Sequence, residues 1–338
     1  MAAALHLLIP GLLGAWPAEL AVPRPAAPAL EWLLARAEVT AIPASLDAVL
    51  FDLFAAPIPS ATDLPIAAVT ALADGINPGD GWWLRADPVH LRPDARGVLL
   101  ADARVLAIEP VEAAALAAAF DQTFAADGLQ LRVPCPERWY LCLPEDPGLH
   151  THPLLDAIGR DINPLLPSGP NARRWHTLLT EAQMLFHAHP VNRAREEHNQ
   201  PMINGLWLWG GGVLPAGAQA PAASLYADDD RLTRGLARLA GAAIRPLPEN
   251  ASDWRQASAP NPDSLVVLNL ARYDRADGDP LAWADHLAVL EQDWFAPLQG
   301  LLQTGQLRTL HLYCGQGRRY SLTRAARWRF WRRNRPIA

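Results

Sequence analysis

The sequence predicts an α/β fold with a mostly parallel sheet and a smaller inserted α+β segment. Short apolar runs of strand length alternate with amphipathic helical segments, and this alternation is typical of parallel sheets that helices cover on both faces. The stretch 96–174 carries a helix and a hairpin of its own, which indicates a separate piece of structure. We therefore expect a core formed by residues 1–95 and 175–338, interrupted by a cap-like insertion at 96–174.

The expected helices carry apolar residues three or four positions apart and are bounded by residues that start or stop helices. Pro57 and Pro59 end one of them, and Pro110 opens another. The expected helices are 29–37, 46–55, a short one beginning at 65, 110–126, 175–189, 230–239 and 280–302.

Strands are expected where short apolar and aromatic runs lie between turn-forming residues. Two such runs flank Pro134 and Pro136, which predicts a hairpin. The proline-rich region 145–171 is expected to form loops. The expected strands are 5–9, 82–85, 98–108, 129–133, 139–143, 205–209, 265–270 and 307–313.

Composition and charge exclude several classes of protein. Half of the 338 residues are apolar and 19% are charged, which excludes a wholly disordered or fibrous chain. The net charge of −6 argues against nucleic acid as a partner, because nucleic-acid-binding proteins carry a basic surface. All 29 basic residues are arginine, which excludes Schiff-base and P-loop lysine chemistry.

Cysteine usage and the N-terminus bear on location. The three cysteines, Cys135, Cys142 and Cys314, lack C-x-x-C spacing, so neither a disulfide framework nor a zinc site is expected, and a cytoplasmic location is favoured. The apolar N-terminus has the hydrophobicity of a signal peptide, but no basic residue precedes Arg24 and Pro10 interrupts the run, so we expect a buried strand there. No run of about 18 apolar residues occurs, and no transmembrane segment is expected.

Two H-x-H-P motifs, at His150 with His152 and at His187 with His189, are candidate metal sites. In an extended strand such a pair shares one face and can bind a metal ion through its imidazole nitrogens. At the end of a helix, where the second pair is expected, residues two apart point in different directions and histidines interact with the helix dipole. The second interpretation is favoured, so no metal site is assigned.

The sequence Arg-Ala-Asp-Pro-Val-His at 85–90 follows a predicted strand. Ligands of open α/β sheets bind at the carboxyl ends of strands, so Arg85, Asp87 and His90 form a candidate site for an anion. The alternative is an ion pair between Arg85 and Asp87 that stabilises a turn, and the local pattern does not separate the two.

The C-terminal segment 318–335 contains eight arginines interleaved with tyrosine, tryptophan and phenylalanine. Such a segment can stack on nucleobases or lie on anionic lipid. The favoured interpretation is that the aromatic rings pack on the domain while the arginines stay solvated.

Several motifs, taken in order, resemble a known family. The segment from His189 to Gly212, which begins His-Pro-Val-Asn and ends Trp-Leu-Trp-Gly-Gly-Gly, resembles a segment of the archaeal-type cofactor-independent phosphoglycerate mutases of the alkaline phosphatase superfamily. The turn at Ser45 resembles that family's nucleophile turn, and Arg85 falls at a corresponding strand end. The resemblance implies an alkaline-phosphatase-like three-layer core. The whole chain also resembles a proteobacterial group of RpfE-type regulatory proteins.

The departures from the family pattern concern the metal ligands. The resemblance implies two divalent cations, such as manganese or zinc, held by oxygen and imidazole ligands. The ligand positions correspond here to Pro10-Gly11, to the segment 273–279 without its histidine, and to Tyr313-Cys314-Gly315, which leaves Asp274 as a candidate for a retained ligand. A serine without a metal to lower its pKa is a poor nucleophile at neutral pH, so we expect no cofactor and an inactive Ser45.

The leading hypothesis is a non-catalytic, regulatory relative that binds a phosphorylated or acidic metabolite, with a protein as a further candidate partner. Arg85 and Arg195 are expected to line one cleft. The alternatives are an active mutase or phosphohydrolase whose metal ligands have moved, for instance to the H-x-H-P histidines, and a module that binds a protein or a membrane surface through the C-terminal tail. The predicted binding residues are Arg85, Asp87, His90, His152, His189, Asn192, Arg195 and Asn204.

Overall fold

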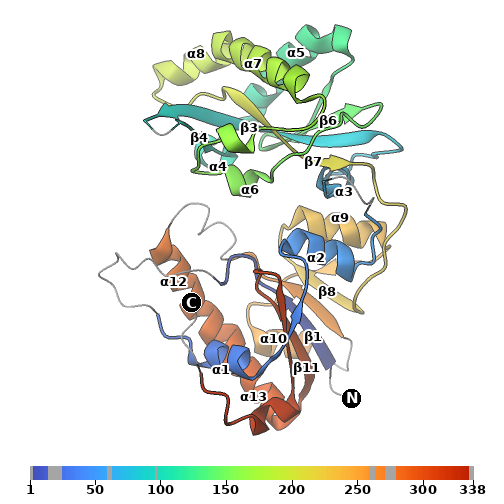
Figure 1. Cartoon of the computed structure of the whole chain (residues 1–338), viewed down its shortest axis with the longest axis vertical. Coiled ribbons are helices and arrows are strands. Elements are labelled where there is room, and N and C mark those ends of the chain that lie inside the picture. The colour runs from blue at the N-terminus through green and yellow to red at the C-terminus, as the bar shows by residue number, and fades with distance from the viewer. Residues whose placement is uncertain are drawn as a thin grey trace. The chain divides into compact units, whose positions relative to one another are not determined.

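The structure is a computed structural model, and it describes residues 3–13, 25–58, 63–95, 97–258, 263–270 and 279–334. The chain divides into two compact units (Figure 1). Unit 1 consists of Met1–Pro57 and Gly217–Ala338, and unit 2, Ile58–Ala216, is inserted between them. Both units combine helices and strands, which confirms the α/β class.

The inserted unit is longer than the expected 96–174. The strands expected in the core at 82–85 and 205–209 extend over 82–94 and 205–212 and pair with each other, and the first of them also pairs with the hairpin of the insertion. A strand belongs to the sheet that satisfies its backbone hydrogen bonds, and the local pattern of residues does not show which sheet that is.

Unit 1 contains a sheet whose order in the described residues is β2-β12-β11-β1-β10-β8-β9. Strands β11, β1, β10, β8 and β9 are parallel, and at one edge β12 pairs antiparallel with both β11 and β2, so the sheet is mostly parallel as expected. The strands are β1 (Ala3–Leu8), β2 (Glu38–Ala41), β8 (Ser224–Ala227), β9 (Ile244–Arg245), β10 (Ser264–Val267), β11 (Leu307–Tyr313) and β12 (Arg318–Thr323). Of these, β2, β8, β9 and β12 are not predicted from the sequence, because three of them have four residues or fewer and β12 lies in the arginine-rich segment.

One face of this sheet packs on helices through a large hydrophobic core. Leu7 of β1 and Leu312 of β11 point into it, because side chains along a strand alternate between the two faces. Glu291 accepts hydrogen bonds from the first free N–H groups of α1, Ala29 at 2.5 Å and Leu30 at 3.0 Å, and so ties that helix to the core. The helices of this face are α1 (Pro28–Arg36), α10 (Ala251–Ala257), α12 (Pro280–Leu290) and α13 (Ala296–Thr304), with the π-helical turn η3 (Glu291–Phe295) joining the last two.

The remaining helices of unit 1 are α2 (Leu46–Leu53) and α9 (Arg231–Leu239), which contact each other, and the 3-10 turn η4 (Arg324–Trp328), which follows β12. The predicted helix 280–302 is confirmed with the irregular turn η3 inside it. Among the helices of the described ranges, none combines the length and the hydrophobicity that a membrane crossing requires.

Unit 2 is built on an antiparallel sheet in which the long strand β3 pairs with β4, β6 and β7, and β6 also pairs with β5. The predicted strand 82–85 continues to Asp94, and the predicted strand 98–108 ends at Ala101, where a short helix begins. The strands are β3 (Trp82–Asp94), β4 (Gly97–Ala101), β5 (Leu131–Cys135), β6 (Arg138–Leu143) and β7 (Gly205–Gly212). The helices are α3 (Ile66–Ala73), α4 (Ala103–Leu106), α5 (Pro110–Phe124), α6 (Leu154–Ala157), α7 (Ala172–Ala188) and α8 (Pro190–Glu197), with the 3-10 turns η1 (Ala125–Asp127) and η2 (Asn163–Leu165).

The two faces of the unit 2 sheet differ in composition. Leu84 and Leu208 belong to a core shared with α5 and α7. Trp83 and Tyr140 pack instead against α3. Since side chains alternate along β3, Arg85 lies on the same face as Trp83, opposite α5 and α7.

Candidate functional site

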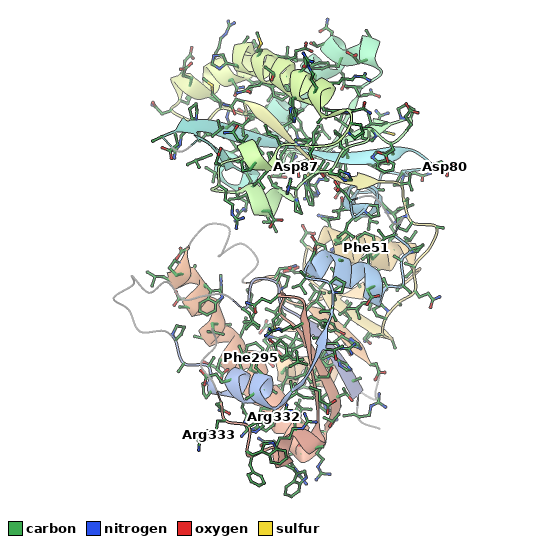
Figure 2. The ribbon with its side chains drawn as sticks, viewed as in Figure 1. Phe51, Asp80, Asp87, Phe295, Arg332 and Arg333 are labelled. Carbon is green, nitrogen blue, oxygen red and sulfur yellow. The ribbon has the colours of Figure 1, made fainter. Side chains whose placement is uncertain are left out.

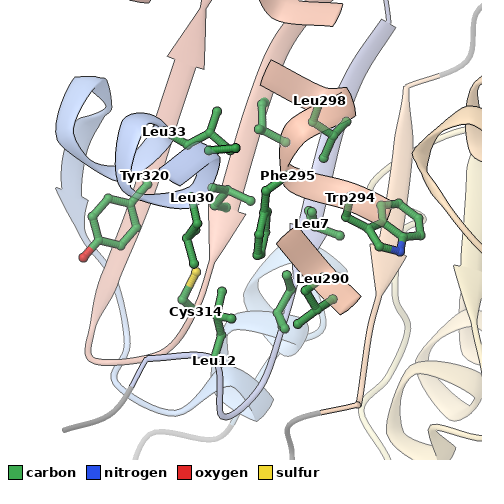
Figure 3. Packing of buried hydrophobic residues seen from close by; sticks show 14 of the residues in the cluster. Leu7, Leu12, Leu30, Leu33, Leu290, Trp294, Phe295, Leu298, Cys314 and Tyr320 are labelled. Atoms are coloured by element: carbon green, nitrogen blue, oxygen red, sulfur yellow. The ribbon is translucent and has the colours of Figure 1, made fainter. Parts of the chain in front are cut away.

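Apolar side chains fill the ends of β1 and β11, where the family resemblance implies metal ligands. Leu12 follows β1 and is fully buried, and Cys314 follows β11 and is 2% exposed. Both belong to the hydrophobic core together with Leu30 of α1 (Figure 3). Burial raises the pKa of the Cys314 thiol to about 12, so this side chain is uncharged at neutral pH. These two strand ends do not fit a divalent cation, which needs anionic or neutral donor atoms turned toward it.

Oxygen-bearing side chains at other strand ends are already engaged. Asp228 after β8 accepts a 3.0 Å hydrogen bond from Asn269 after β10. Asp279 caps α12 by accepting two 3.0 Å bonds from backbone N–H groups of the first turn. Asp274 lies outside the described residues. In the part of the chain that the structure describes, no group of three or more histidine, cysteine, aspartate and glutamate side chains is arranged to hold a metal ion.

Ser45, the position that resembles the family's nucleophile, is the N-cap of α2. Its hydroxyl accepts a long hydrogen bond of 3.5 Å from the backbone N–H of Ala48, and the side chain is exposed. Serine is a preferred N-cap residue because its oxygen satisfies a helix N–H that has no partner in the helix. The contacts of Ser45 therefore assign it a capping role.

Arg85 and Asp87 form a buried ion pair in unit 2, with 2.6 Å between Arg85 Nη2 and Asp87 Oδ1. Arg85 lies over the rings of Tyr140 and Trp209, and the indole N–H of Trp209 donates to Asp87 at 2.7 Å. Burial disfavours the charged guanidinium, but Asp87 outweighs this effect, so the pKa of Arg85 is raised. The ion pair of the structural alternative is therefore present, but it lies inside β3 and not at a turn or a strand end, and Arg85 is engaged with Asp87. Figure 2 labels Asp87 within unit 2.

Arg195 of α8 is also buried and fully engaged. Its guanidinium pairs with Glu112 of α5 at 2.5 Å. It further donates to the backbone carbonyls of Pro201, at 2.8 Å, and Leu106. Arg195 therefore joins three segments of unit 2 that are distant in the sequence.

Arg85 and Arg195 do not line one cleft, which corrects the expectation from the sequence. Arg85 lies on the face of the sheet that packs against α3, whereas α8 packs with α5 and α7 on the opposite face. The alternation of side chains along β3 sends Arg85 away from the helices that carry Arg195. The family pattern contains both motifs but does not show that their side chains are separated. In the folded unit the sheet lies between them.

The other predicted binding residues hold backbone segments together. Asn192 donates to the carbonyls of Phe186 and Ile203 and accepts from the N–H of Ile203, so it fixes the loop that leads into β7. Asn204 exchanges two hydrogen bonds with the backbone of Leu91, at 2.7 and 2.9 Å.

The predicted histidines likewise make backbone contacts. The ring nitrogen Nδ1 of His90 bonds the carbonyl of Met202 at 2.8 Å, and that of His152 bonds the carbonyl of Leu165 at 3.0 Å. His189 caps α8 by accepting from a backbone N–H at 3.2 Å. His152 therefore contacts a loop carbonyl through Nδ1, and His189 lies at a helix end, where the sequence places the second motif.

A polar cluster that the sequence analysis does not single out lies on the face of the unit 1 sheet opposite the helices α1, α12 and α13, a face on which Leu8 and Leu265 are also buried. We call it the outer-face cluster, and it consists of His6, His311, Tyr313, Arg319 and Ser321. A 2.9 Å hydrogen bond joins His6 Nδ1 to the Tyr313 hydroxyl, and another joins His311 Nδ1 to the Ser321 hydroxyl. The two imidazole rings are 4.8 Å apart.

Strand register produces this cluster. His6 of β1 lies opposite His311 of β11, and His311 lies opposite Ser321 of β12. Tyr313 lies opposite Arg319 in the same way, and burial raises the pKa of Tyr313 while the neighbouring Arg319 opposes this rise. Alternation places all five side chains on one face, because their strand neighbours face the core.

Arg319 is the cationic member of this cluster, and the carboxylates that act electrostatically on its neighbours are Asp263, on His6, and Asp52, on Tyr313. Arg319 forms no ion pair with a carboxylate in the described part of the chain, although its Nε atom is buried and has no hydrogen-bond partner. The neighbouring strand β2 offers Glu38 opposite Ser321, but that carboxylate is paired with Arg329. An arginine in this setting attracts an anion from solution.

The two histidines are neutral at physiological pH. Burial lowers the pKa of His311 to about 4, and His6 and Arg319 act in the same direction. Burial also lowers the pKa of His6, with Asp263 opposing and Arg319 adding to the effect. Unfolded His311 takes up a proton near pH 6.5, so its contribution to stability is present above that pH and is lost as the pH falls toward 4.

One sequence signal could have indicated this cluster. The triplet Leu-His-Leu occurs at 5–7 and again at 310–312, each time inside a predicted buried strand. A polar residue between two apolar ones in a strand must face away from the core that the apolar ones enter. That the two triplets lie side by side depends on the strand order, which the sequence pattern does not give.

Comparison with known proteins finds distant relatives. No protein-family model matches the chain. The 2,3-bisphosphoglycerate-independent phosphoglycerate mutase of Methanothrix thermoacetophila is 27% identical over 130 residues, which cover 38% of this chain and 31% of that protein. The protein of the same name from Methanosarcina barkeri is 32% identical over 60 residues, which cover 18% of this chain and 15% of that protein.

The chain is weakly homologous to the archaeal cofactor-independent phosphoglycerate mutases. The matched stretches span less than a third of the length of either relative. The predicted resemblance to this family is supported to that extent, while the alkaline phosphatase superfamily and the RpfE-type group stay predictions.

Solved structures with a related fold include the PH0037 protein of Pyrococcus horikoshii. It aligns with a TM-score of 0.56 and 14% identity, covering 95% of this chain and 86% of that one. The cofactor-independent phosphoglycerate mutase of Thermoplasma acidophilum aligns with a TM-score of 0.46 and 17% identity, covering 96% of this chain and 90% of that one. The first likeness shows that the fold extends over nearly the whole chain.

The structural role of Arg195 can be tested by unfolding. Arg195→Met should lower the free energy of unfolding by about 3 kcal/mol, because Glu112 would lose its partner and two buried carbonyls their donor. Denaturant titration followed by circular dichroism measures the loss. Arg193→Met, on the exposed side of the same helix, should change it by less than about 0.5 kcal/mol, and equal effects of the two variants would contradict the assignment.

Thiol labelling tests the burial of Cys314. Burial raises the pKa of all three thiols, so the expected difference rests on access of the reagent. In the native protein a maleimide should modify Cys135 and Cys142, which are partly exposed, and leave Cys314 unmodified until denaturant is added. Peptide mass spectrometry identifies the labelled positions, and native labelling of Cys314 at the rate of Cys142 would show that the end of β11 is open.

Proposed function

We propose that this chain is a non-catalytic relative of the cofactor-independent phosphoglycerate mutases that binds a small anion at the outer-face cluster. The observation that carries the proposal is Arg319, a half-buried arginine without a carboxylate partner in the described residues. Such a charge is costly to keep near a sheet surface unless an anion can approach it. The protein would then act by binding and release of a metabolite, not by turnover.

The proposed loss of catalysis is supported by what occupies the strand ends. Leu12 and Cys314 belong to the apolar core, so a cation placed there would meet leucine side chains and an uncharged thiol. Ser45 caps a helix and has no hydrogen bond to a histidine or carboxylate in the described part of the chain. Without a metal or a base, a serine hydroxyl is not activated for attack on a phosphate.

The chemistry of the cluster favours a phosphate or carboxylate group. A guanidinium presents a planar fork of donors that matches two oxygens of either group. When the hydroxyls of Tyr313 and Ser321 donate to the Nδ1 atoms of the histidines, each neutral ring carries its proton on Nε2. Those Nε2 atoms make no hydrogen bond within the described residues, so they are available to an oxygen of the ligand.

Binding of an anion and protonation of the histidines would be coupled. An anion beside His6 and His311 favours their charged form and raises their lowered pKa values. The affinity for an anion should therefore increase as the pH falls below neutrality. An arginine site without the histidines would lack this dependence, because arginine stays charged at every pH in the range.

The first test of this proposal is metal content and turnover. Protein purified without chelators should contain neither manganese nor zinc in stoichiometric amount, since the described strand ends supply no set of ligands. Elemental analysis measures the metal, and a coupled phosphoglycerate mutase assay measures turnover with and without added manganese. Two tightly held ions per chain, or turnover that Ser45→Ala abolishes, would establish the enzyme alternative.

The second test is anion binding. Sulfate, which does not titrate in this range, should raise the melting temperature, and the rise should grow as the pH falls from about 6.5 toward about 4, where His6 and then His311 take up protons. Arg319→Gln should abolish the rise, while Arg318→Gln, its exposed neighbour on β12, should preserve it. Equal rises in both variants would refute binding at the cluster.

Competition then separates the two kinds of anionic ligand. Glycerate and phosphoglycerate share a carboxylate, and only the second carries a phosphate group. A lower half-maximal concentration for phosphoglycerate than for glycerate would assign the phosphate as the recognised group. Equal concentrations would assign the carboxylate.

A further inference from the structure

The C-terminal segment 324–334 is held on unit 1 by its arginines. Arg329 donates to the backbone carbonyl of Arg36 at 2.7 Å, and Arg332 donates to the carbonyl of Ala37 at 2.6 Å. These carbonyls lie at the end of α1, where helix carbonyls lack partners within the helix. Arg329 also forms the ion pair with Glu38 of β2. The segment is therefore anchored through its positive charges.

The aromatic side chains of the same segment face solvent. Trp328 is 63% exposed, Phe330 76% and Trp331 67%. Phe330 and Trp331 form an edge-to-face pair at 5.5 Å, and the guanidinium of Arg327 lies 4.7 Å from the ring centre of Trp328. This corrects the interpretation favoured by the sequence, in which the rings pack and the arginines are solvated. Arg329 and Arg332, and not the rings, contact the body of unit 1, because carbonyls at the end of α1 and the carboxylate of Glu38 on β2 accept their hydrogen bonds.

The surface around these rings is strongly basic. Eight of the 29 arginines lie between positions 318 and 335, and no aspartate or glutamate occurs in that stretch, although the whole chain has a net charge of −6. Arg324 and Arg333 of the same segment are exposed, and Figure 2 labels Arg333 next to Arg332. We call Trp328, Phe330, Trp331, Arg324 and Arg333 the aromatic-arginine surface.

We propose that the aromatic-arginine surface docks unit 1 on an anionic lipid bilayer. Tryptophan and phenylalanine insert at the level of the lipid headgroups, and arginine is attracted by the phosphates of anionic lipids. Neither contribution alone gives stable attachment, but apolar insertion combined with a basic patch does. The segment carries three exposed rings within four residues together with its arginines, so it offers both contributions. Hydrogen bonds already hold it in place, so docking does not have to order it.

A bilayer fits this surface better than a nucleic acid does. Arginine recognises bases through paired hydrogen bonds from its guanidinium group. The guanidinium groups of Arg327, Arg329 and Arg332 already donate to backbone carbonyls. The rings of Phe330 and Trp331 are packed edge to face with each other, so they do not form parallel platforms for successive bases. A lipid surface needs neither free forks nor stacking planes.

Vesicle sedimentation with the full chain tests the proposal. Vesicles of phosphatidylcholine alone are compared with vesicles of equimolar phosphatidylcholine and phosphatidylglycerol. The full chain should bind the anionic vesicles at least tenfold more tightly than the neutral ones, and added salt should weaken this binding because it screens the arginines. The triple variant Trp328→Ser, Phe330→Ser, Trp331→Ser should lose at least tenfold in affinity for the anionic vesicles.

A matched control removes exposed apolar side chains elsewhere. Val111→Ser with Met184→Ser, at positions 75% and 68% exposed on α5 and α7 of unit 2, should leave vesicle binding unchanged. Circular dichroism checks that both variants are folded. Vesicle binding that is equal for neutral and anionic lipid, or equal in the triple variant and the control, would overturn the proposal. So would binding of a single-stranded oligonucleotide that is tighter than vesicle binding and is lost in the triple variant.

Discussion

Strand β11 pairs with β1 on one side and with β12 on the other, and its side chains alternate between the two faces of the unit 1 sheet. Leu310, Leu312 and Cys314 enter the core with α1, α12 and α13. His311 and Tyr313, on the opposite face, meet His6 of β1 and the side chains of β12. The same alternation that buries Cys314 after the end of this strand thereby builds the outer-face cluster. Core and cluster are two consequences of one register.

The arginines of this lysine-free chain differ in the groups that they bind, and these groups indicate the role of each arginine. Arg85 and Arg195 are buried with a carboxylate each and hold unit 2 together. Arg329 and Arg332 attach the C-terminal segment to carbonyls of unit 1. Arg319 differs from all of these because it has no carboxylate partner among the described residues, and this is why it carries the functional proposal. The partner of an arginine, more than its presence in a motif, indicates whether it is structural or available.

The segment that resembles the phosphoglycerate mutases has a structural explanation in this chain. Asn192 and Arg195 both bond the backbone of the loop before β7, and Asn204 joins that loop to β3. A side chain that completes backbone hydrogen bonds inside a folded unit cannot be replaced without leaving polar groups unpaired. A resemblance carried by such residues is therefore compatible with a shared fold, whatever the activity.

The sequence by itself determined the α/β class, most of the helices, the central strands and the absence of lysine chemistry. These follow from periodicity and composition, which act over a few neighbouring residues. Only the tertiary structure decided the extent of unit 2, the burial of Arg85 with Asp87 and the outward orientation of Trp328, Phe330 and Trp331. It also brought together His6 and Tyr313, which are 307 positions apart in the chain. Strand order and hydrogen-bond partners are set by competition among distant segments for the same backbone groups and the same core, and no local pattern records the outcome of that competition.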